Sequence, residues 1–145
     1  MYKNVLFPVD LAHESSWKYA LPVTIEHVRA FRSNLHVMTV VPDSGMSIVS
    51  QYFSADAVKK VIEKTNENLH AFVKEHIPED INTHKVVATG NVYESIIGAS
   101  KKIGADLIVM SAHRPELKDY LLGPNAARVV RHSDCSVLVV RPFAA

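Results

Sequence analysis

The sequence predicts an α/β domain whose parallel sheet is covered by helices on both faces. Two observations carry this prediction: short, nearly continuous apolar runs, and amphipathic segments with helical spacing that alternate with them. Continuous apolar runs suit strands that are buried on both faces, and parallel strands need a crossover, usually a helix. With 145 residues the chain has room for one domain with a substantial core and is too short for two, so we expect residues 1–145 to form a single domain.

The first elements follow from these patterns in order. Residues 5–9 form a short apolar run and predict the first strand. Residues 14–31 predict a helix, in which Pro22 cannot donate its backbone hydrogen bond and therefore suggests a kink or a late start. Residues 35–41 predict the second strand. Residues 42–55 contain several serines and no period, which is typical of a loop.

The middle of the chain continues the alternation. An amphipathic helix is predicted from Asp56 and ends at residues 77–80, and residues 82–88 predict the third strand. Asn91 stands three residues before a glutamate, which is the spacing of a capping box, and opens the next helix. Gly104 suits the end of that helix.

The last third of the chain has the pattern of a ligand-binding edge. Residues 106–110 predict a fourth strand, residues 121–126 a turn into a last helix, and residues 136–140 a fifth strand. Ligands of open parallel sheets bind beyond the carboxyl ends of the strands. His113 and Arg114 follow the fourth strand at such an end, where a guanidinium and a helix N-terminus would suit a phosphate. The alternative is a solvated loop with two incidental polar side chains.

Several segments resemble the signature of the universal stress proteins, most closely of the bacterial F/G-type members. These segments are residues 2–10, 111–115, 120–127, 129–132 and 135–141. The resemblance covers essentially the whole chain and is weakest between residues 42 and 80. It implies a Rossmann-like fold with five strands in the order 3-2-1-4-5.

The resemblance also implies a set of nucleotide-binding residues. It places Pro8, Val9 and Asp10 at the border of an adenosine pocket and Val40 against the base. The Asp10 carboxylate could bind a ribose hydroxyl, an adenine amine or magnesium, whereas the residues alone favour a helix cap or a tight turn. The predicted phosphate end comprises Ser111, His113, Arg114, Gly123, Pro124, Asn125 and Ala126.

The residues of the turn before the last helix each have a property that suits a helix start or an anion. Gly123 permits a close backbone approach or a positive φ. Pro124 suits the first position of a helix. Asn125 and Ala126 would then present first-turn N–H groups to an anion.

The chain departs at four points from the pattern of the nucleotide-binding members, which is Gly, two residues, Gly, nine residues, Gly and then Ser or Thr. Ser111 and Arg114 stand in place of the first two glycines, the spacer has eight residues, and Pro124 replaces the final Ser or Thr. The proline removes an N–H and a hydroxyl, each worth about 1.5–3 kcal/mol towards a charged group, or roughly ten- to a hundredfold in affinity. We expect binding to persist with an altered phosphate preference, since Arg114 and Asn125 add donors.

The implied ligand is an adenine nucleotide (ATP, ADP or AMP), with magnesium accompanying ATP, and the implied role is regulatory in a stress response. Two alternatives remain open: a nucleotide-free dimeric interaction module, and a weak ATPase or nucleotidyl-transferring relative. No catalytic residues and no metal ligands are expected, because the eight histidines lack ligand spacing and Cys135 has no base partner in sequence. Any hydrolysis would be slow without a general base.

The composition and the last strand indicate which classes of partner to expect. A net charge of +1 excludes a global attraction to nucleic acid or anionic lipid. A single cysteine and the lack of a signal peptide or membrane-spanning run predict a cytoplasmic protein. The apolar strand Ser136 to Arg141 would be a sheet edge, and the resemblance implies a homodimer paired through it. A regulatory protein of unknown identity is a further expected partner. The loop of residues 42–55 could present apolar side chains to it, fold over the nucleotide or remain mobile.

Overall fold

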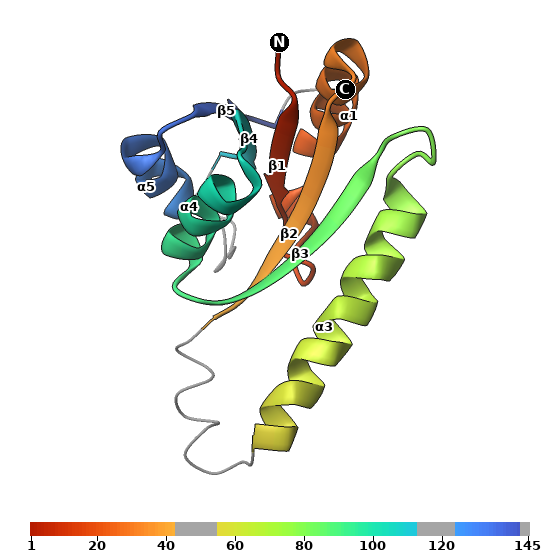
Figure 1. The fold of residues 1–145 in the computed structure, drawn as a ribbon, viewed down its shortest axis with the longest axis vertical. Helices are drawn as coiled ribbons and strands as arrows, with labels where there is room; N and C mark the ends of the chain where they lie inside the picture. Colours follow the sequence, from red (N-terminus) through yellow and green to blue (C-terminus); the bar gives the residue numbers. More distant parts are fainter. Residues whose placement is uncertain (43–54, 113–123, 143–145) are drawn as a thin grey trace.

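A five-stranded parallel sheet forms the centre of the computed structural model, which describes residues 1–42, 55–112 and 124–142 (Figure 1). The strands are β1 (Asn4–Pro8), β2 (Asn34–Pro42), β3 (Thr83–Gly90), β4 (Leu107–Ser111) and β5 (Ser136–Val140). Their order, β3-β2-β1-β4-β5, is the predicted one. The chain proceeds outward from β1 to β3 and then crosses back to β4, so the strand order reverses between β1 and β4, where open α/β sheets bind ligands.

Helices cover both faces of the sheet. They are α1 (Ala20–Phe31), α3 (Ala55–His76), α4 (Val92–Ile103) and α5 (Asn125–His132), preceded by a 3₁₀ turn, η1 (Glu14–Ser16). None of the helices in the described ranges is both long and apolar enough to cross a membrane. Side chains of α1 and α3 share one core and those of α4 and α5 the other, and α4 and α5 lie together beside β4 and β5 in Figure 1.

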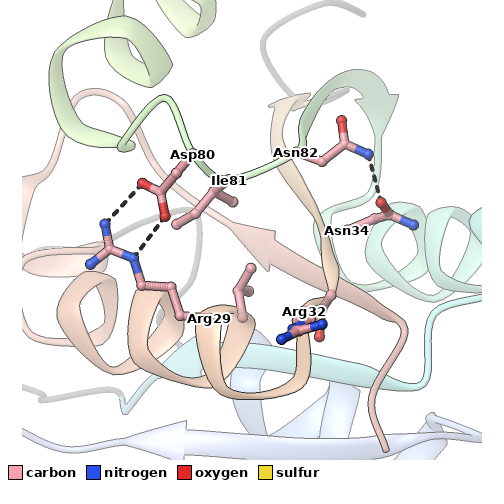
Figure 2. A pocket seen from close by; sticks show the side chains of 8 residues that line it. Arg29, Arg32, Asn34, Asp80, Ile81 and Asn82 are labelled. Carbon is pink, nitrogen blue, oxygen red and sulfur yellow. Dashed lines mark hydrogen bonds and ion pairs between the residues drawn. The ribbon is translucent and has the colours of Figure 1, made fainter.

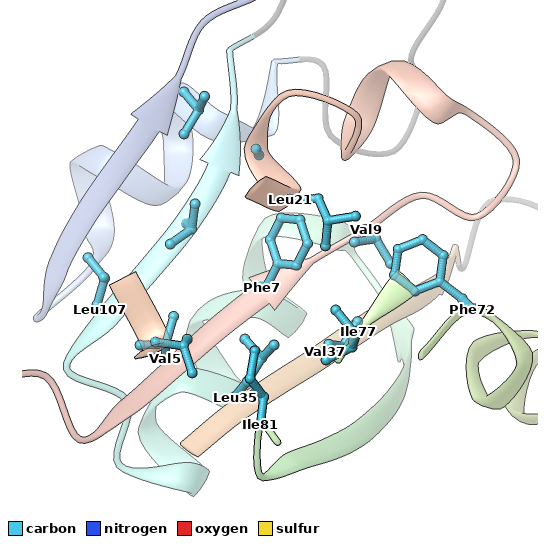
Figure 3. Packing of buried hydrophobic residues seen from close by; sticks show 14 of the residues in the cluster. Val5, Phe7, Val9, Leu21, Leu35, Val37, Phe72, Ile77, Ile81 and Leu107 are labelled. Atoms are coloured by element: carbon cyan, nitrogen blue, oxygen red, sulfur yellow. The ribbon is translucent and has the colours of Figure 1, made fainter. Parts of the chain in front are cut away.

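Strand β1 contributes to both cores because successive side chains point to opposite faces. Val5 and Phe7, with Val9 directly after the strand, pack into the core under α1 and α3 (Figure 3), whereas Leu6 packs under α4 and α5. All four side chains are at most 1% exposed. A strand buried on both faces explains why this part of the sequence shows a continuous apolar run instead of an alternating pattern.

The helix predicted for residues 14–31 is divided in the structure. The turn η1 ends at Ser16, and α1 begins only at Ala20. Pro22 therefore lies in the first turn of α1, where backbone N–H groups have no partner within the helix and a proline costs little. The late start anticipated from Pro22 is confirmed.

Helix α4 begins and ends as its sequence predicts. The Asn91 side chain accepts a hydrogen bond of 3.2 Å from the Glu94 N–H, and Gly104 ends the helix in the left-handed region at φ 67°. In the amphipathic helix α3 the apolar residue Val61 is 41% exposed, whereas Leu69 and Phe72 are buried. In Figure 1 the first turns of α3 project past the end of β2, which agrees with an exposed start of this helix.

Candidate functional site

A cavity of about 360 Å³ lies beyond the carboxyl end of β1 and beside the last residues of β2, next to α3. Its lining consists of Asp10, Leu11, Ala12, Thr39, Val40, Val41, Thr65 and Asn68. The volume lies in the range of roughly 300–1,000 Å³ that small-molecule sites occupy. Three segments far apart in the sequence thus meet beside the point where the strand order reverses.

Asp10 is the acidic residue of this cavity, and it is 2% exposed. Its Oδ1 accepts a hydrogen bond of 3.0 Å from the Ala12 N–H, and its Oδ2 lies 2.8 Å from His13 Nδ1. The contact with Ala12 is an Asx turn, in which an aspartate replaces a backbone acceptor. A carboxylate has about four acceptor positions, so Asp10 retains capacity for a ligand hydroxyl while it holds the turn after β1.

A pair of serines connects the ends of β1 and β4. Ser16 Oγ accepts from the Asp10 N–H at 2.9 Å, and its single hydroxyl proton is shared between the carbonyl oxygens of Asp10 and His13, at 3.0 and 2.8 Å. Ser111 Oγ in turn donates to the Ser16 carbonyl oxygen at 2.7 Å. The hydroxyl of Ser111, predicted to face the ligand, is thus used to fix η1 against β4. Ser16 was missed because nothing in its sequence neighbourhood marks it.

Of the residues predicted around the base, one lines the cavity and two are buried behind its lining. Val40 is 6% exposed and lines the cavity with Asp10, and its contact with a base stays a prediction. Val9 is 1% exposed, packs into the core under α1 and α3, and donates its N–H to the Met38 carbonyl at 2.8 Å. Pro8 is the buried last residue of β1. Val9 and Pro8 therefore position the turn that carries Asp10.

Some lining residues were not anticipated from the sequence. Thr39, at 3% exposure, lines the cavity from β2. Thr65 and Asn68 line it from α3. Thr65 lies within the apolar stripe of α3, and a hydroxyl in such a stripe is the signal that could have identified it.

The predicted phosphate end is described in part. His113, Arg114 and Gly123 lie outside the described residues. Pro124 is the residue before α5, with φ −70°, so the helix begins one position later than predicted. Asn125 and Ala126 open α5 and are 8% and 5% exposed.

A second cavity of about 360 Å³ lies at this end of the sheet, between the start of α5 and β5. It is lined by Ala112, Pro124, Ala126, Ala127, Val130, Val139 and Arg141. The Ala112 N–H donates to the Val140 carbonyl oxygen at 2.8 Å, which joins the exits of β4 and β5. The first turn of α5 therefore faces a hollow at the same edge that Asp10 occupies.

A third, smaller cavity of about 240 Å³ lies at the opposite, amino end of the sheet (Figure 2). Here Arg29 donates two hydrogen bonds of 3.1 and 3.0 Å to the Asp80 carboxylate. These bonds raise the pKa of Arg29 and lower the pKa of Asp80. Among the described residues of the predicted site, none lines this cavity.

Metal ligands do not gather in the part of the chain that the structure describes. Within residues 1–42, 55–112 and 124–142, no group of three His, Cys, Asp or Glu side chains could hold a metal ion. Asp10 could still supply one carboxylate to a magnesium ion whose other ligands are phosphate oxygens and water, which is how nucleotide-bound magnesium is commonly held.

Comparison with known proteins gives consistent matches over the whole chain. A family model described as the universal stress protein family matches residues 1–141. Universal stress protein G of Escherichia coli O157:H7 is 30% identical over 149 residues, which cover 97% of this chain and 100% of that protein.

Solved structures share the architecture. Protein MJ0577 of Methanocaldococcus jannaschii superposes with a TM-score of 0.73 at 23% identity, covering 100% of this chain and 99% of the other. A universal stress protein family protein of Arabidopsis thaliana with AMP bound superposes with a TM-score of 0.65 at 20% identity, covering 98% and 93%. At these identities the likeness concerns the fold.

Proposed function

The chain belongs to the universal stress protein family, and we propose on this premise that it binds an adenine nucleotide at the carboxyl edge of its sheet. The observation that carries the proposal is the cavity in which the Asp10 carboxylate and Val40 meet beside the reversal of strand order. The family protein of Arabidopsis thaliana with AMP bound supports an adenine nucleotide as the class of ligand.

The lining of the cavity suits an adenosine moiety. Leu11, Val40 and Val41 supply apolar surface for a base, and the spare acceptor capacity of Asp10 suits a ribose hydroxyl. The phosphates would then extend towards the first turn of α5, where the N–H groups of Asn125 and Ala126 favour negative charge. Magnesium would accompany ATP and neutralise part of the phosphate charge when it is bound.

The proposed role is regulatory, in a cytoplasmic stress response. The acid that lines the cavity, Asp10, is assigned to the ribose in this proposal, which leaves it away from the phosphates and unsuited to activate water there. Hydrolysis of ATP, if it occurs, would be slow. A nucleotide-responsive binding protein fits this arrangement better than an enzyme.

A homodimer through β5 is the proposed assembly. Strand β5 is an edge of the sheet, and its Val139 is 36% exposed next to Val130 of α5, which is 51% exposed. An apolar edge strand presents unpaired backbone groups and favours pairing with another strand. A second copy can satisfy that edge by pairing the same strand across a twofold axis.

The rival function is a nucleotide-free interaction module with the same fold. Two observations favour it: Pro124 provides neither an N–H nor a hydroxyl before α5, and the Asp10 carboxylate is partly satisfied by the protein itself. Affinity lost in this way could exceed what the remaining contacts restore.

Calorimetric titration with ATP, ADP, AMP and adenosine distinguishes the two functions. The proposal predicts saturable binding of the nucleotides and weaker, measurable binding of adenosine. Mass spectrometry of small molecules released from freshly purified protein is an independent readout. Absence of both heat and thermal stabilisation with ATP, ADP and AMP would establish the nucleotide-free module instead.

A further inference from the structure

Strand pairing brings Arg141 to the exit of β4. Strands β4 and β5 are parallel and in register, with Ser111 opposite Val140. The hydrogen bond of 2.8 Å from the Ala112 N–H to the Val140 carbonyl extends this pairing one residue past β4. Arg141 is the next residue of the chain and therefore leaves the sheet beside the carboxyl end of β4.

The direction of β5 side chains places Arg141 on the side of α5. Successive residues of a strand face opposite sides, and Val137 packs into the core under α4 and α5. Val139 and Arg141 continue this alternation, and both line the cavity at the start of α5. Arg141 thus shares a hollow with Pro124 and Ala126, residues of the proposed phosphate end.

Arg141 is the charged member of an otherwise apolar lining. Among the residues that the structure describes, no carboxylate is paired with its guanidinium. The apolar stem of an arginine can lie along a surface such as that of Val139 while its head remains available for an anion. An exposed guanidinium at the edge of this cavity is suited to bind phosphate through paired hydrogen bonds.

We propose that Arg141 is a phosphate-binding residue of the nucleotide site and supplies, from the position directly after β5, the donor that Pro124 cannot provide before α5. This inference rests on the proposed nucleotide binding and adds the residue that recognises its phosphate part. Arg141 would contribute to the binding of ATP and AMP and would contribute nothing to the binding of adenosine, which carries no phosphate.

The size of the effect follows from the chemistry of the contact. A hydrogen bond to a charged group contributes about tenfold to affinity at its lower bound, and exposure of Arg141 keeps its contribution near that bound. The contribution should decrease as salt is raised from about 0.05 M to about 0.5 M, because exposed charges are screened. Lysine retains the charge and loses the bidentate geometry, so it should restore the contribution in part.

The test compares Arg141→Gln, Arg141→Lys and the wild-type protein in calorimetric titrations with ATP, AMP and adenosine. Arg131→Gln is the matched control, since Arg131 is an exposed arginine in the last turn of α5 and is not among the residues that line the cavity. We expect Arg141→Gln to lower the affinity for ATP and AMP about tenfold and to leave the affinity for adenosine unchanged. Arg141→Lys should recover part of the lost affinity, and Arg131→Gln should have the affinities of the wild type.

The outcomes separate this inference from the proposed function. If wild-type protein binds neither nucleotide nor adenosine, the proposed function fails and the role of Arg141 fails with it. If the wild type binds both and Arg141→Gln leaves the ratio of ATP to adenosine affinity unchanged, only the inference on Arg141 is overturned. An equal loss for adenosine and ATP also overturns it, because it would show a general effect on the fold or the dimer.

Discussion

Single residues at the carboxyl edge serve the fold and the proposed ligand at the same time. Asp10 holds the turn after β1 through Ala12 and His13, and Ser111 holds η1 through Ser16. The type and approximate place of these polar residues could be predicted from sequence, because they follow apolar strands. Their partners could not, since Ser16 and Ser111 are 95 residues apart and meet only through the fold.

Substitution of Asp10 separates its two roles. Asp10→Ala removes the acceptor for the Ala12 N–H and the partner of His13, and we expect unfolding free energy to fall by about 1–3 kcal/mol in urea denaturation. Asp10→Asn keeps an amide oxygen for Ala12 and should cost less. An Asp10→Ala protein as stable as the wild type would show that the carboxylate does not hold this turn.

The same pair of variants tests ligand recognition at Asp10. Since the proposed contact is with ribose, Asp10→Asn should lower the affinities for ATP, AMP and adenosine by a similar factor of roughly tenfold. This pattern differs from that expected for Arg141, where adenosine is unaffected. Calorimetry at constant salt measures both. Undiminished adenosine binding in Asp10→Asn would exclude the ribose contact.

At the scale of elements, the strands were easier to predict than the helix ends. Runs such as residues 5–9 and 106–110 are buried on both faces and leave a continuous apolar signal that matches β1 and β4 to within a residue or two. The exposed start of α3 was not foreseen, because an amphipathic pattern does not reveal where the sheet ends. Strand order came from the family resemblance, since periodicity carries no information on which strands are neighbours.

The pairing of β2 with β3 predicts a dependence of stability on pH. His36 lies opposite His84 in register, their ring centroids are 4.8 Å apart, and His36 Nε2 lies 3.4 Å from Asn4 Oδ1. Burial, and to a lesser extent the charge of His84, lower the pKa of His36 below its usual 6.5. The folded state therefore favours the neutral imidazole.

The direction in which stability changes with pH follows from proton binding. Below the unfolded pKa of 6.5 the unfolded chain takes up a proton at His36 that the folded protein resists, so unfolding free energy decreases as pH falls from 6.5 towards the lowered folded pKa. Above 6.5 the contribution is fully present. Urea denaturation at about pH 7.5 and about pH 5.5 measures this decrease in unfolding free energy. The decrease should be smaller for His36→Gln than for wild type, and the control His27→Gln should behave as the wild type does. Equal decreases for wild type and His36→Gln would contradict this account.

At the scale of the whole molecule, the edge strand β5 determines the expected assembly. Val139→Lys places a charge on the exposed edge of β5, and we expect it to convert a dimer into a monomer in light scattering coupled to gel filtration. Val61→Lys is the control, because Val61 is similarly exposed on α3, whose core lies on the other face of the sheet. A dimer that persists in Val139→Lys would place the interface elsewhere.

The central claim is that an adenine nucleotide occupies the carboxyl edge of the sheet, and amide chemical shifts measured by NMR during titration with ATP test it most directly. The account predicts saturable shifts for Asp10, Val40 and Ala126, and none for Arg29 and Arg32, which line the cavity at the amino end (Figure 2). Shifts confined to the amino end, or no shifts in excess ATP, would contradict it.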